Sequence, residues 1–266
     1  MIAPKRQIKS IKGATMKKEY ITNEAWSKIF IFLKNHKRVH ATNEIKLKLF
    51  IEAVYWIMWT GAQWRELPHK YGKWNSVFAR FNDWSKKGIW SDLNDYCIEG
   101  PDLEWVMIDS TVVRAHACAS GYKKGQCEQQ GLGRSKGGFT SKIHAAVDAL
   151  GNALKLIITP GQRGDITEAK NLTQDIRNAA ILGDKGYDSD EFRADMAQKN
   201  CTPVIPGRSN RKVKIEYDEE LYKARHLIEN FFANIKHFRR IFSRFDKSLR
   251  NYAAFLAIAG AALWLR

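Results

Sequence analysis

The chain has 266 residues and carries 44 lysines and arginines against 28 aspartates and glutamates, a net charge of +16 that predicts a polyanionic partner, either nucleic acid or an anionic membrane surface. Its 44% apolar content allows a sizeable core and excludes a disordered or collagen-like chain. Four scattered cysteines exclude a disulfide framework, and the longest apolar run falls short of the roughly 20 residues of a membrane span.

The first hundred residues predict a helical region. Residues 1–15 are basic and aperiodic, which predicts a flexible tail. From Asn23, apolar residues recur every three or four positions through residue 58, and after a break near Thr60 the aromatic stripe from Trp74 to Trp84 predicts another helix. Helices around a short break are typical of a helix-turn-helix unit, so residues 16–100 predict a DNA-binding domain. A tryptophan-rich bundle with purely structural aromatics is the alternative.

Beyond residue 100 the pattern changes to short apolar runs that alternate with helices. Strands are predicted over 105–108, 143–147, 154–159, 179–182 and 202–205, and helices over 165–178, 190–199, 218–240 and 248–264. A turn at Gly151 joins the second and third strands into a hairpin. Strands that pair first by a hairpin and then alternate with helices indicate an α/β fold, a mixed sheet flanked by helices, over residues 101–266.

Three carboxylates occupy unusual positions in this pattern. Asp109 and Asp184 each follow a short apolar run, where a carboxylate can project from the sheet into a crevice. Glu229 lies within the long predicted helix. The narrow face that it shares on the helical wheel also contains Tyr222, Arg225 and Lys236. Each carboxylate also has a plain structural explanation, as a cap residue, a loop residue or the partner of Arg225.

Three carboxylates in a chain of such positive charge have a chemical use. Carboxylate oxygens are ligands that Mg²⁺ prefers. Three of them can hold two divalent cations about 3.5–4 Å apart, the arrangement that drives in-line phosphoryl displacement. The hypothesis is therefore that Asp109, Asp184 and Glu229 bind two Mg²⁺ ions, with Mn²⁺ as the alternative ion, and act on a phosphodiester.

Several sequence blocks follow one another in a distinctive order. They are Thr60–Pro68, Tyr71–Trp74, Arg80–Trp84, Ile108–His116, Lys136–His144 and Asp184–Asp188, followed by Tyr222-x2-Arg225-x3-Glu229-x6-Lys236. With these blocks, the chain resembles the DDE transposases of bacterial insertion sequences, specifically insertion-sequence family five. The last block matches that family's Tyr-Arg-Glu-Lys signature at full spacing, and the resemblance extends from about Trp26 to the C-terminus.

The resemblance implies a ribonuclease-H-like catalytic core preceded by a small all-helical domain that reads the element's ends. Asp109, Asp184 and Glu229 would be the metal-binding catalytic triad. Asp109 would lie on the first strand, Asp184 on or just after the fourth, and Glu229 on a helix across the sheet. It also implies a cytoplasmic, nucleoid-associated bacterial enzyme without a membrane partner. This enzyme would bind double-stranded DNA of the element's ends and of the target, and would pair two ends as a homodimer.

The basic stretch after Glu229 predicts a track for DNA phosphates. Residues 236–250 hold six cations and one acid, a net charge of +5. In a helix that reaches residue 240, Arg240 shares the face of Lys236, and the resemblance places Lys236 on the element-end DNA. A solvated cationic face is the alternative. The residues expected to contact DNA are Tyr222, Arg225, Lys236, Arg239, Arg240 and Arg244.

The leading hypothesis is a transposase that cleaves DNA at the terminal inverted repeats of its own insertion sequence and joins the ends to target DNA. Water would attack first, and the freed 3′-hydroxyl would then attack the target. The alternatives are a catalytically silent DNA-binding descendant and a ribonuclease-H-like nuclease without strand transfer. The intact triad argues against the first alternative, and the helical region, which end recognition needs, argues against the second.

Overall fold

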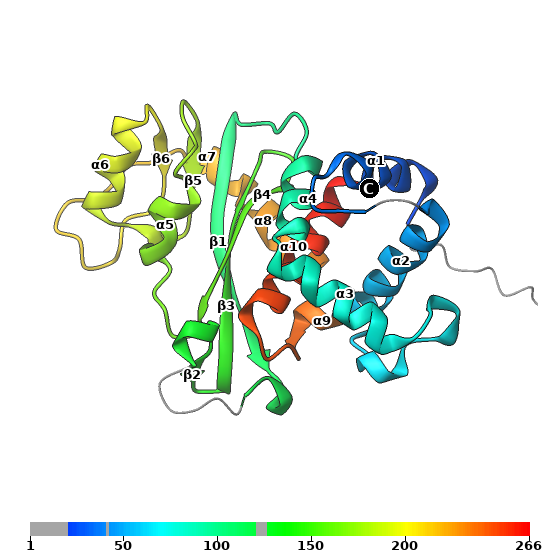
Figure 1. Cartoon of the computed structure of the whole chain (residues 1–266). Coiled ribbons are helices and arrows are strands. Elements are labelled where there is room, and N and C mark those ends of the chain that lie inside the picture. Colours follow the sequence, from blue (N-terminus) through cyan, green and yellow to red (C-terminus); the bar gives the residue numbers. More distant parts are fainter. Residues whose placement is uncertain (1–20, 41–42, 121–126) are drawn as a thin grey trace, which may run out of the picture.

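The computed structural model describes residues 21–40, 43–120 and 127–266, and the basic tail predicted for residues 1–15 lies outside this part. The described residues form layers around a mixed sheet (Figure 1). The N-terminal helices are α1 (Asn23–Asn35), α2 (Glu44–Thr60), α3 (Trp74–Lys86) and α4 (Ile89–Cys97). The later helices are α5 (Ile166–Leu172), α6 (Asp190–Gln198), α7 (Glu219–Tyr222), α8 (His226–Lys236), α9 (Arg239–Phe242) and α10 (Leu249–Trp264).

The sheet is centred on β1. Its strands are β1 (Trp105–Ala115), β2 (Gly133–Ser135), β3 (Gly138–Val147), β4 (Ala153–Pro160), β5 (Ala180–Leu182), β6 (Thr202–Val204) and β7 (Ser243–Arg244). On one side β1 pairs antiparallel with β3, which also pairs with β2 and β4, and on the other side it pairs parallel with β5, followed by β6. Short β7 pairs parallel with the end of β1. The predicted fold class, a mixed sheet flanked by helices and preceded by a helical region, is therefore confirmed.

The predicted hairpin is formed by β3 and β4. Its turn is held by Asp148, whose Oδ1 accepts hydrogen bonds from the backbone N–H groups of Leu150 at 3.1 Å and Asn152 at 2.7 Å. Gly151 has a φ of 84°, a left-handed conformation that other residues rarely adopt. The turn therefore brings β4 back along one edge of β3, and the other edge of β3 pairs with β1.

Strand β1 is longer than the sequence predicts. The predicted strand ended before Asp109, whereas β1 continues to Ala115 and its register with β3 extends to the pair Arg114 and Thr140. The β-branched residues that follow Asp109 suit a strand, and pairing on β3 supplies partners for their backbone groups. Asp109 therefore lies in the middle of a central strand rather than at its end.

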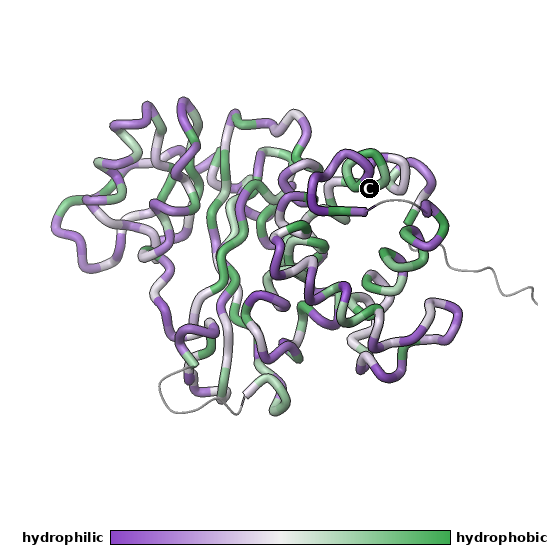
Figure 2. The backbone as a smooth tube through the Cα atoms, viewed as in Figure 1, coloured by the Kyte–Doolittle hydropathy of each residue, from purple (hydrophilic) through white to green (hydrophobic). Residues whose placement is uncertain are grey.

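Alternation along β1 divides the buried residues between the two faces of the sheet. Val106 and Ile108 face α5 and α6, while Met107 and Val113 face the layer that contains α8 and α10. Figure 2 shows the apolar segments gathered in the central strands and the inner helices, with hydrophilic segments around the periphery. Asp109 has the parity of Met107, so its side chain lies on the α8 face.

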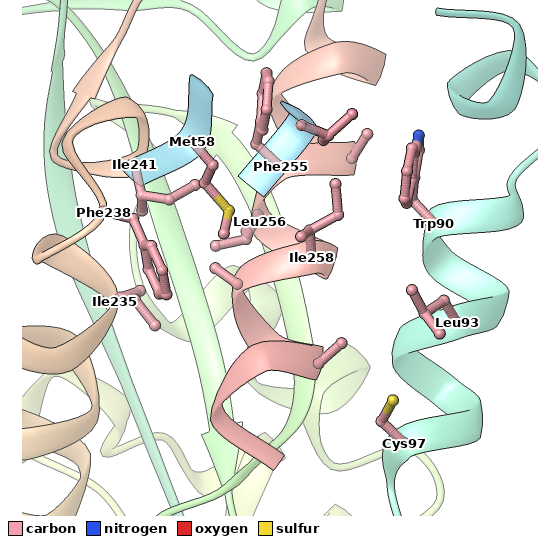
Figure 3. Close-up of a cluster of buried hydrophobic side chains, with 14 of the residues drawn as sticks. Met58, Trp90, Leu93, Cys97, Ile235, Phe238, Ile241, Phe255, Leu256 and Ile258 are labelled. Carbon is pink, nitrogen blue, oxygen red and sulfur yellow. The ribbon is translucent and has the colours of Figure 1, made fainter. Parts of the chain in front are cut away.

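Helix α10 joins the N-terminal helices to the rest of the chain. Its Phe255 stacks on Phe81 of α3 with ring centroids 4.5 Å apart, and α10 also packs along α4. Figure 3 shows side chains of α2, α4 and α8–α10 meeting around it. The described residues before and after position 100 thus share one core, and a DNA-end-binding role for the predicted domain of residues 16–100 stays a prediction. Among the described residues, no helix has the length and apolar character needed to cross a membrane.

The connection between α2 and α3 differs from the one predicted. Residues 61–73 contain two short 3-10 turns, Trp64–Glu66 and His69–Tyr71. A helix-turn-helix motif joins its helices by about three or four residues, so α2 and α3 do not form one. Helix α4 follows α3 almost directly and has no counterpart among the predicted elements.

The long helix predicted over residues 218–240 is divided in the structure. It consists of α7, a 3-10 turn at Lys223–Arg225, and α8, which ends at Lys236, before α9 begins at Arg239. Phe238 adopts an extended conformation between α8 and α9, where its buried ring contacts Tyr55 and Trp59 of α2. Burial of Phe238 and Ile241 in the shared core accounts for this break. Similarly, α5 ends well before the predicted residue 178.

Candidate active site

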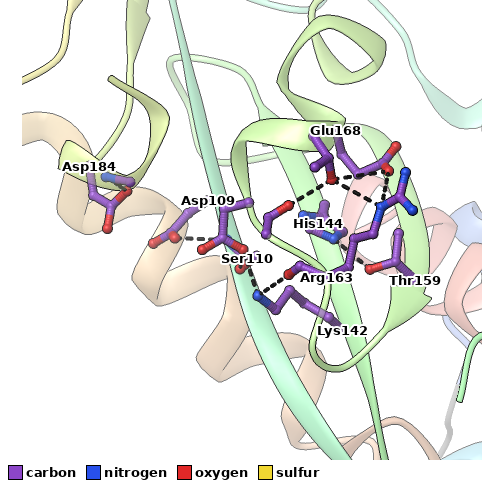
Figure 4. A network of polar contacts seen from close by, with 12 residues as sticks. Asp109, Ser110, Lys142, His144, Thr159, Arg163, Glu168 and Asp184 are labelled. Atoms are coloured by element: carbon purple, nitrogen blue, oxygen red, sulfur yellow. Dashed lines mark hydrogen bonds and ion pairs between the residues drawn. The ribbon is translucent and has the colours of Figure 1, made fainter. Parts of the chain in front are cut away.

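Two of the three predicted catalytic carboxylates come from neighbouring strands. Asp109 lies within β1 beside Ala145 of β3, and Asp184 follows β5, which pairs with β1 up to Met107 and Leu182. Figure 4 shows both carboxylates in this arrangement. Burial raises the pKa of Asp109, and the charge of Asp184 raises it further, while the Ser110 amide and the Arg225 guanidinium act in the opposite direction. Asp109 lies on the first strand, as expected, but Asp184 follows the fifth strand rather than the fourth, because the short strand β2 was not predicted.

Arg225 connects the first carboxylate to the third. Its Nη1 donates a hydrogen bond to Oδ2 of Asp109 at 2.7 Å, and its Nη2 donates one to Oε1 of Glu229. Arg225 closes the 3-10 turn before α8, and Glu229 lies in the first turn of α8, four residues later. The Glu229 side chain is 57% exposed, whereas those of Asp109 and Arg225 are 20% exposed. The site is therefore open to solvent on the Glu229 side.

The chemistry of these donors suits a divalent cation, but a guanidinium lies between two of them. Among the described residues, no three His, Cys, Asp or Glu side chains gather as a ready-made cation site. One oxygen of Asp109 accepts a hydrogen bond from the Ser110 N–H at 2.7 Å, and one oxygen of Asp184 accepts one from the Gly186 N–H at 2.8 Å. A cation shared by Asp109 and Glu229 would take the place of the positive charge of Arg225.

The structure brings Lys236 and Tyr222 close to these carboxylates. Lys236 Nζ donates a hydrogen bond to Oγ1 of Thr111 at 2.6 Å, two residues after Asp109 on the same face of β1. Burial lowers the pKa of Lys236. Burial raises the pKa of Tyr222, which lies near Arg225 and Asp184. Arg239 is exposed at the start of α9.

Arg240 and Arg244 are buried, so the expectation that they contact DNA is wrong. Arg240 donates hydrogen bonds to the two carboxylate oxygens of buried Asp246 at 3.0 and 3.1 Å, and another to the Ala62 carbonyl oxygen at 2.9 Å. Arg244 donates to Oγ of Ser141 at 2.7 Å and to backbone carbonyl oxygens. These guanidinium groups find their partners inside the protein, which leaves them no surface from which to reach a phosphate.

A polar network behind Asp109 was not identified from the sequence. Ser110 points to the opposite face of β1, where its Oγ donates to Oδ1 of Asp165 at 2.6 Å, and Lys142 Nζ donates to the same oxygen at 2.9 Å (Figure 4). Burial acts to raise the pKa of Asp165, but these two hydrogen bonds outweigh it and lower the pKa. The network fixes the residue next to Asp109. A signal was present, because Lys142 and His144 alternate with apolar residues and so mark one polar face of β3.

His144 belongs to the same polar face and has a structural role. Its Nε2 lies 2.8 Å from Oγ1 of Thr159 on β4, and burial lowers its pKa to about 4. The ring is therefore neutral at ordinary pH, and the contact joins the two strands of the hairpin.

Comparison with known proteins gives the class of the chain. Residues 101–264 match the family model "Transposase DDE domain", and residues 21–94 match "Putative transposase of IS4/5 family". The first match spans more than half of the chain. The chain therefore belongs to the family of DDE transposases, and its N-terminal helical region matches a model of putative transposases of the IS4/5 family.

Individual relatives agree with this assignment. "Putative transposase for insertion sequence element IS6501" of Brucella ovis is 38% identical over 130 residues, which is 48% of this chain and 100% of that protein. "Putative transposase for insertion sequence element IS402" of Burkholderia cepacia is 30% identical over 130 residues, 44% of this chain and 59% of that protein.

Solved transposase structures are more distant. A piggyBac transposase synaptic complex with hairpin DNA has a TM-score of 0.41 and 14% identity, with 73% of this chain and 48% of that chain covered. The Mos1 strand transfer complex has a TM-score of 0.34 and 12% identity, with 78% of this chain and 68% of that chain covered. The present chain thus spans about half the length of the piggyBac chain.

Proposed function

We propose that this transposase cleaves DNA at the terminal inverted repeats of its own insertion sequence and joins the ends to target DNA by in-line phosphoryl transfer. The observation that carries the proposal is the arrangement of Asp109, Asp184 and Glu229. Asp109 stands on β1, Asp184 follows the neighbouring strand β5, and Glu229 is joined to Asp109 through Arg225. A rigid sheet that presents carboxylates to solvent suits phosphodiester chemistry.

The residues around the triad would position the reacting groups. Asp109, Asp184 and Glu229 would hold two Mg²⁺ ions, with Mn²⁺ as the alternative, and bound ions would neutralise the phosphate and activate water or a 3′-hydroxyl. The hydrogen bond from Ser110 Oγ to Asp165 Oδ1, 2.6 Å long, holds β1 in place behind Asp109. Lys236 lies along β1 from Asp109 and would bind a phosphate of the element's end close to the scissile bond.

The partner of this site would be double-stranded DNA, first the element's ends and then the target. The net charge of +16 supports a polyanionic partner. The partly buried Lys236, which contacts Thr111 close to Asp109, and the exposed Arg239 at the start of α9 support contact with phosphates. Residues 16–100 would recognise the end sequence. Because two ends must be held together for joining to a target, the working form would be a homodimer.

The proposal is tested with Asp109→Asn, Asp184→Asn and Glu229→Gln in the full chain. Each substitution should abolish cleavage and joining of a labelled end oligonucleotide in Mg²⁺ or Mn²⁺, while binding of that oligonucleotide stays largely intact. The reason is that carboxylates act on the transition state, whereas affinity comes chiefly from cations. Asp175→Asn, at an 83% exposed side chain, is the matched control and should keep wild-type activity.

The products of the wild-type chain separate the candidate functions. Cleavage followed by joining supports a transposase, cleavage alone supports a nuclease without strand transfer, and specific binding without either reaction supports a silent DNA-binding descendant. Near wild-type joining by any of the three triad variants would overturn the assignment of the site.

A further inference from the structure

The segment between β6 and α7 carries a second group of cations close to the candidate active site. We refer to residues 206–215 as the β6–α7 loop. Its ten residues hold four cations and no acid, namely Arg208, Arg211, Lys212 and Lys214. These cations divide into two pairs in the structure. The two arginines donate hydrogen bonds to other groups of the protein, whereas the two lysines face solvent.

A buried carboxylate fixes this loop to the turn that carries Asp184. Asp188 has a side chain that is 1% exposed, and it accepts hydrogen bonds from Arg211 at 2.5 and 2.8 Å and from Arg193 at 2.9 Å. The backbone N–H of Arg208 donates to the same carboxylate at 2.8 Å. Burial acts to raise the pKa of Asp188, but these donors outweigh it and hold the pKa far below its usual range.

Further contacts close the loop on itself and on the Asp184 turn. The guanidinium of Arg208 donates to the carbonyl oxygens of Lys185 at 3.3 Å and Gly186 at 3.0 Å, directly after Asp184. Gly207 packs so closely on Ile215 that an added methyl group would lie 3.3 Å from Cγ1 of Ile215. The two ends of the loop are thus in contact, and the loop is held as a rigid unit beside the carboxylate.

The two lysines of this loop face solvent. Within the part of the chain that the structure describes, Lys212 and Lys214 are exposed and make no hydrogen bond or ion pair. Two other lysines behave differently, because the exposed Lys170 pairs with Glu191 at 2.6 Å and the partly buried Lys199 pairs with Asp195 at 2.7 Å. A rigid frame therefore presents two uncompensated positive charges next to the site.

We propose that the β6–α7 loop binds the phosphate backbone of the target duplex, through Lys212 and Lys214. This inference rests on the proposed function, in which two duplexes must meet at one set of carboxylates. Lys236 flanks them on the Thr111 side of β1, where the element's end is placed, while the β6–α7 loop flanks them on the Asp184 side. The loop side is therefore the one left for the second duplex.

The chemistry of the loop suits a target of arbitrary sequence. Lysine contacts to phosphates carry no sequence information, and their contribution to affinity arises from release of counterions. The clamp at Asp188 orders the loop before DNA arrives, which reduces the entropy lost on binding. A surface of this kind would hold any duplex in place while the freed 3′-hydroxyl attacks it.

The test uses the full chain with the double substitution Lys212→Gln and Lys214→Gln. The chain is first saturated with a pre-cut end oligonucleotide in the absence of divalent ions, and a fluorescent duplex of unrelated sequence is then titrated at several salt concentrations. Affinity for that duplex should fall several-fold, and the slope of log K against log salt should decrease by about 1.8, at about 0.9 per phosphate contact. Affinity for the end oligonucleotide should stay at the wild-type value.

Two further variants sharpen the result. Lys155→Gln with Lys170→Gln removes the same charge from two lysines that are paired with Asp175 and Glu191, and should leave affinity for the unrelated duplex unchanged. Lys212→Arg with Lys214→Arg keeps the charge and should restore both affinity and slope. An unchanged slope in the glutamine variant overturns the proposal. A loss of end affinity with intact affinity for the unrelated duplex shows instead that the loop binds the element's end, and also overturns it.

Failure of the proposed function remains distinguishable from failure of this inference. The titration measures binding without divalent ions, so it can be read even for a chain that neither cleaves nor joins DNA. If the wild-type chain joins ends to a target but the glutamine variant does so at the wild-type rate over a range of target concentrations, the loop has no part in target binding. A higher target concentration for half-maximal joining is the supporting result.

Discussion

Two stretches of this chain are similarly basic in sequence and differ in structure. Residues 236–250 have a net charge of +5, yet Arg240 and Arg244 are buried with partners inside the protein. The β6–α7 loop has a charge of +4, and its Lys212 and Lys214 are exposed. Arginine presents five donors in a planar fork that internal carboxylates and carbonyls can satisfy, whereas lysine is a strongly hydrated point charge. Charge density in a sequence therefore does not show which cations are available to DNA.

The largest effect that would test this contrast is the loss of the Arg240 ion pair. Arg240→Met should lower the free energy of unfolding by about 3–5 kcal/mol, because it leaves the buried Asp246 carboxylate without its partner. The measurement is urea-induced unfolding of the full chain. Arg239→Met, at the exposed neighbouring position, is the control and should change stability by less than about 0.5 kcal/mol. Normal stability combined with weaker DNA binding in Arg240→Met would restore Arg240 as a DNA contact.

The next effect concerns the clamp that keeps the β6–α7 loop in place. Asp188→Asn should lower the free energy of unfolding at pH 7 by on the order of 2 kcal/mol, since it removes charge-assisted hydrogen bonds from Arg193 and Arg211. The folded pKa of Asp188 lies below its ordinary value of 3.8, so its contribution is fully present above that value and is lost as pH falls toward the folded pKa.

The pH dependence distinguishes a charged clamp from simple packing. Unfolding of wild type and Asp188→Asn is compared from neutral pH down to about pH 3. The difference between the two proteins should shrink steadily below the ordinary carboxyl pKa. A difference that stays constant over this range would mean that the asparagine variant suffers only from altered shape. Thermal or urea unfolding at each pH provides the measurement.

The elements that the sequence predicts well have local causes. The β3–β4 hairpin follows from its turn at Gly151. Helix α10 follows from an apolar run that is too long for a typical strand. The order of Asp109 and Asp184 on adjacent strands follows from two short apolar runs that each precede an aspartate. Glu229 was singled out by the face that it shares on the predicted helix. Its place beside Asp109 depends on Arg225, which lies 116 residues from Asp109 in the sequence.

The features that the sequence misses depend on distant partners. The break after Lys236 arises because Phe238 is buried against Tyr55 and Trp59, far away in the chain. Burial of Arg240 depends on the Ala62 carbonyl, 178 residues away. Asp188 and Asp165 could each be a loop residue by local pattern, and only their partners across 23 and 55 residues reveal them. A one-dimensional pattern does not contain these pairings.

Arg225 is intermediate between the buried and the exposed cations. It is 20% exposed and its guanidinium lies between Asp109 and Glu229. Because this fixed charge competes with a cation for the same carboxylates, Arg225→Gln should bind Mn²⁺ more tightly in the absence of DNA, by about fivefold or more. Titration followed by electron paramagnetic resonance measures the affinity. Lys223→Gln, which removes a nearby cation paired with Glu220, is the control. Weaker Mn²⁺ binding would show that Arg225 is needed to orient Glu229 instead.

The smallest predicted effect belongs to Lys236, the residue of the basic stretch that lies along β1 from Asp109. Its Nζ donates a hydrogen bond to Thr111, so the ammonium group of this partly buried lysine lies at the edge of the site. Lys236→Ala should reduce the salt slope of end binding by about 0.9, the value for one phosphate contact, and weaken cleavage in parallel. Thr111→Val removes the hydrogen-bond acceptor but keeps the charge, so its slope should match wild type. Should Lys236→Ala bind the end oligonucleotide with unchanged affinity and slope, the lysine serves only to join α8 to β1, and the exposed DNA-facing cations would lie elsewhere.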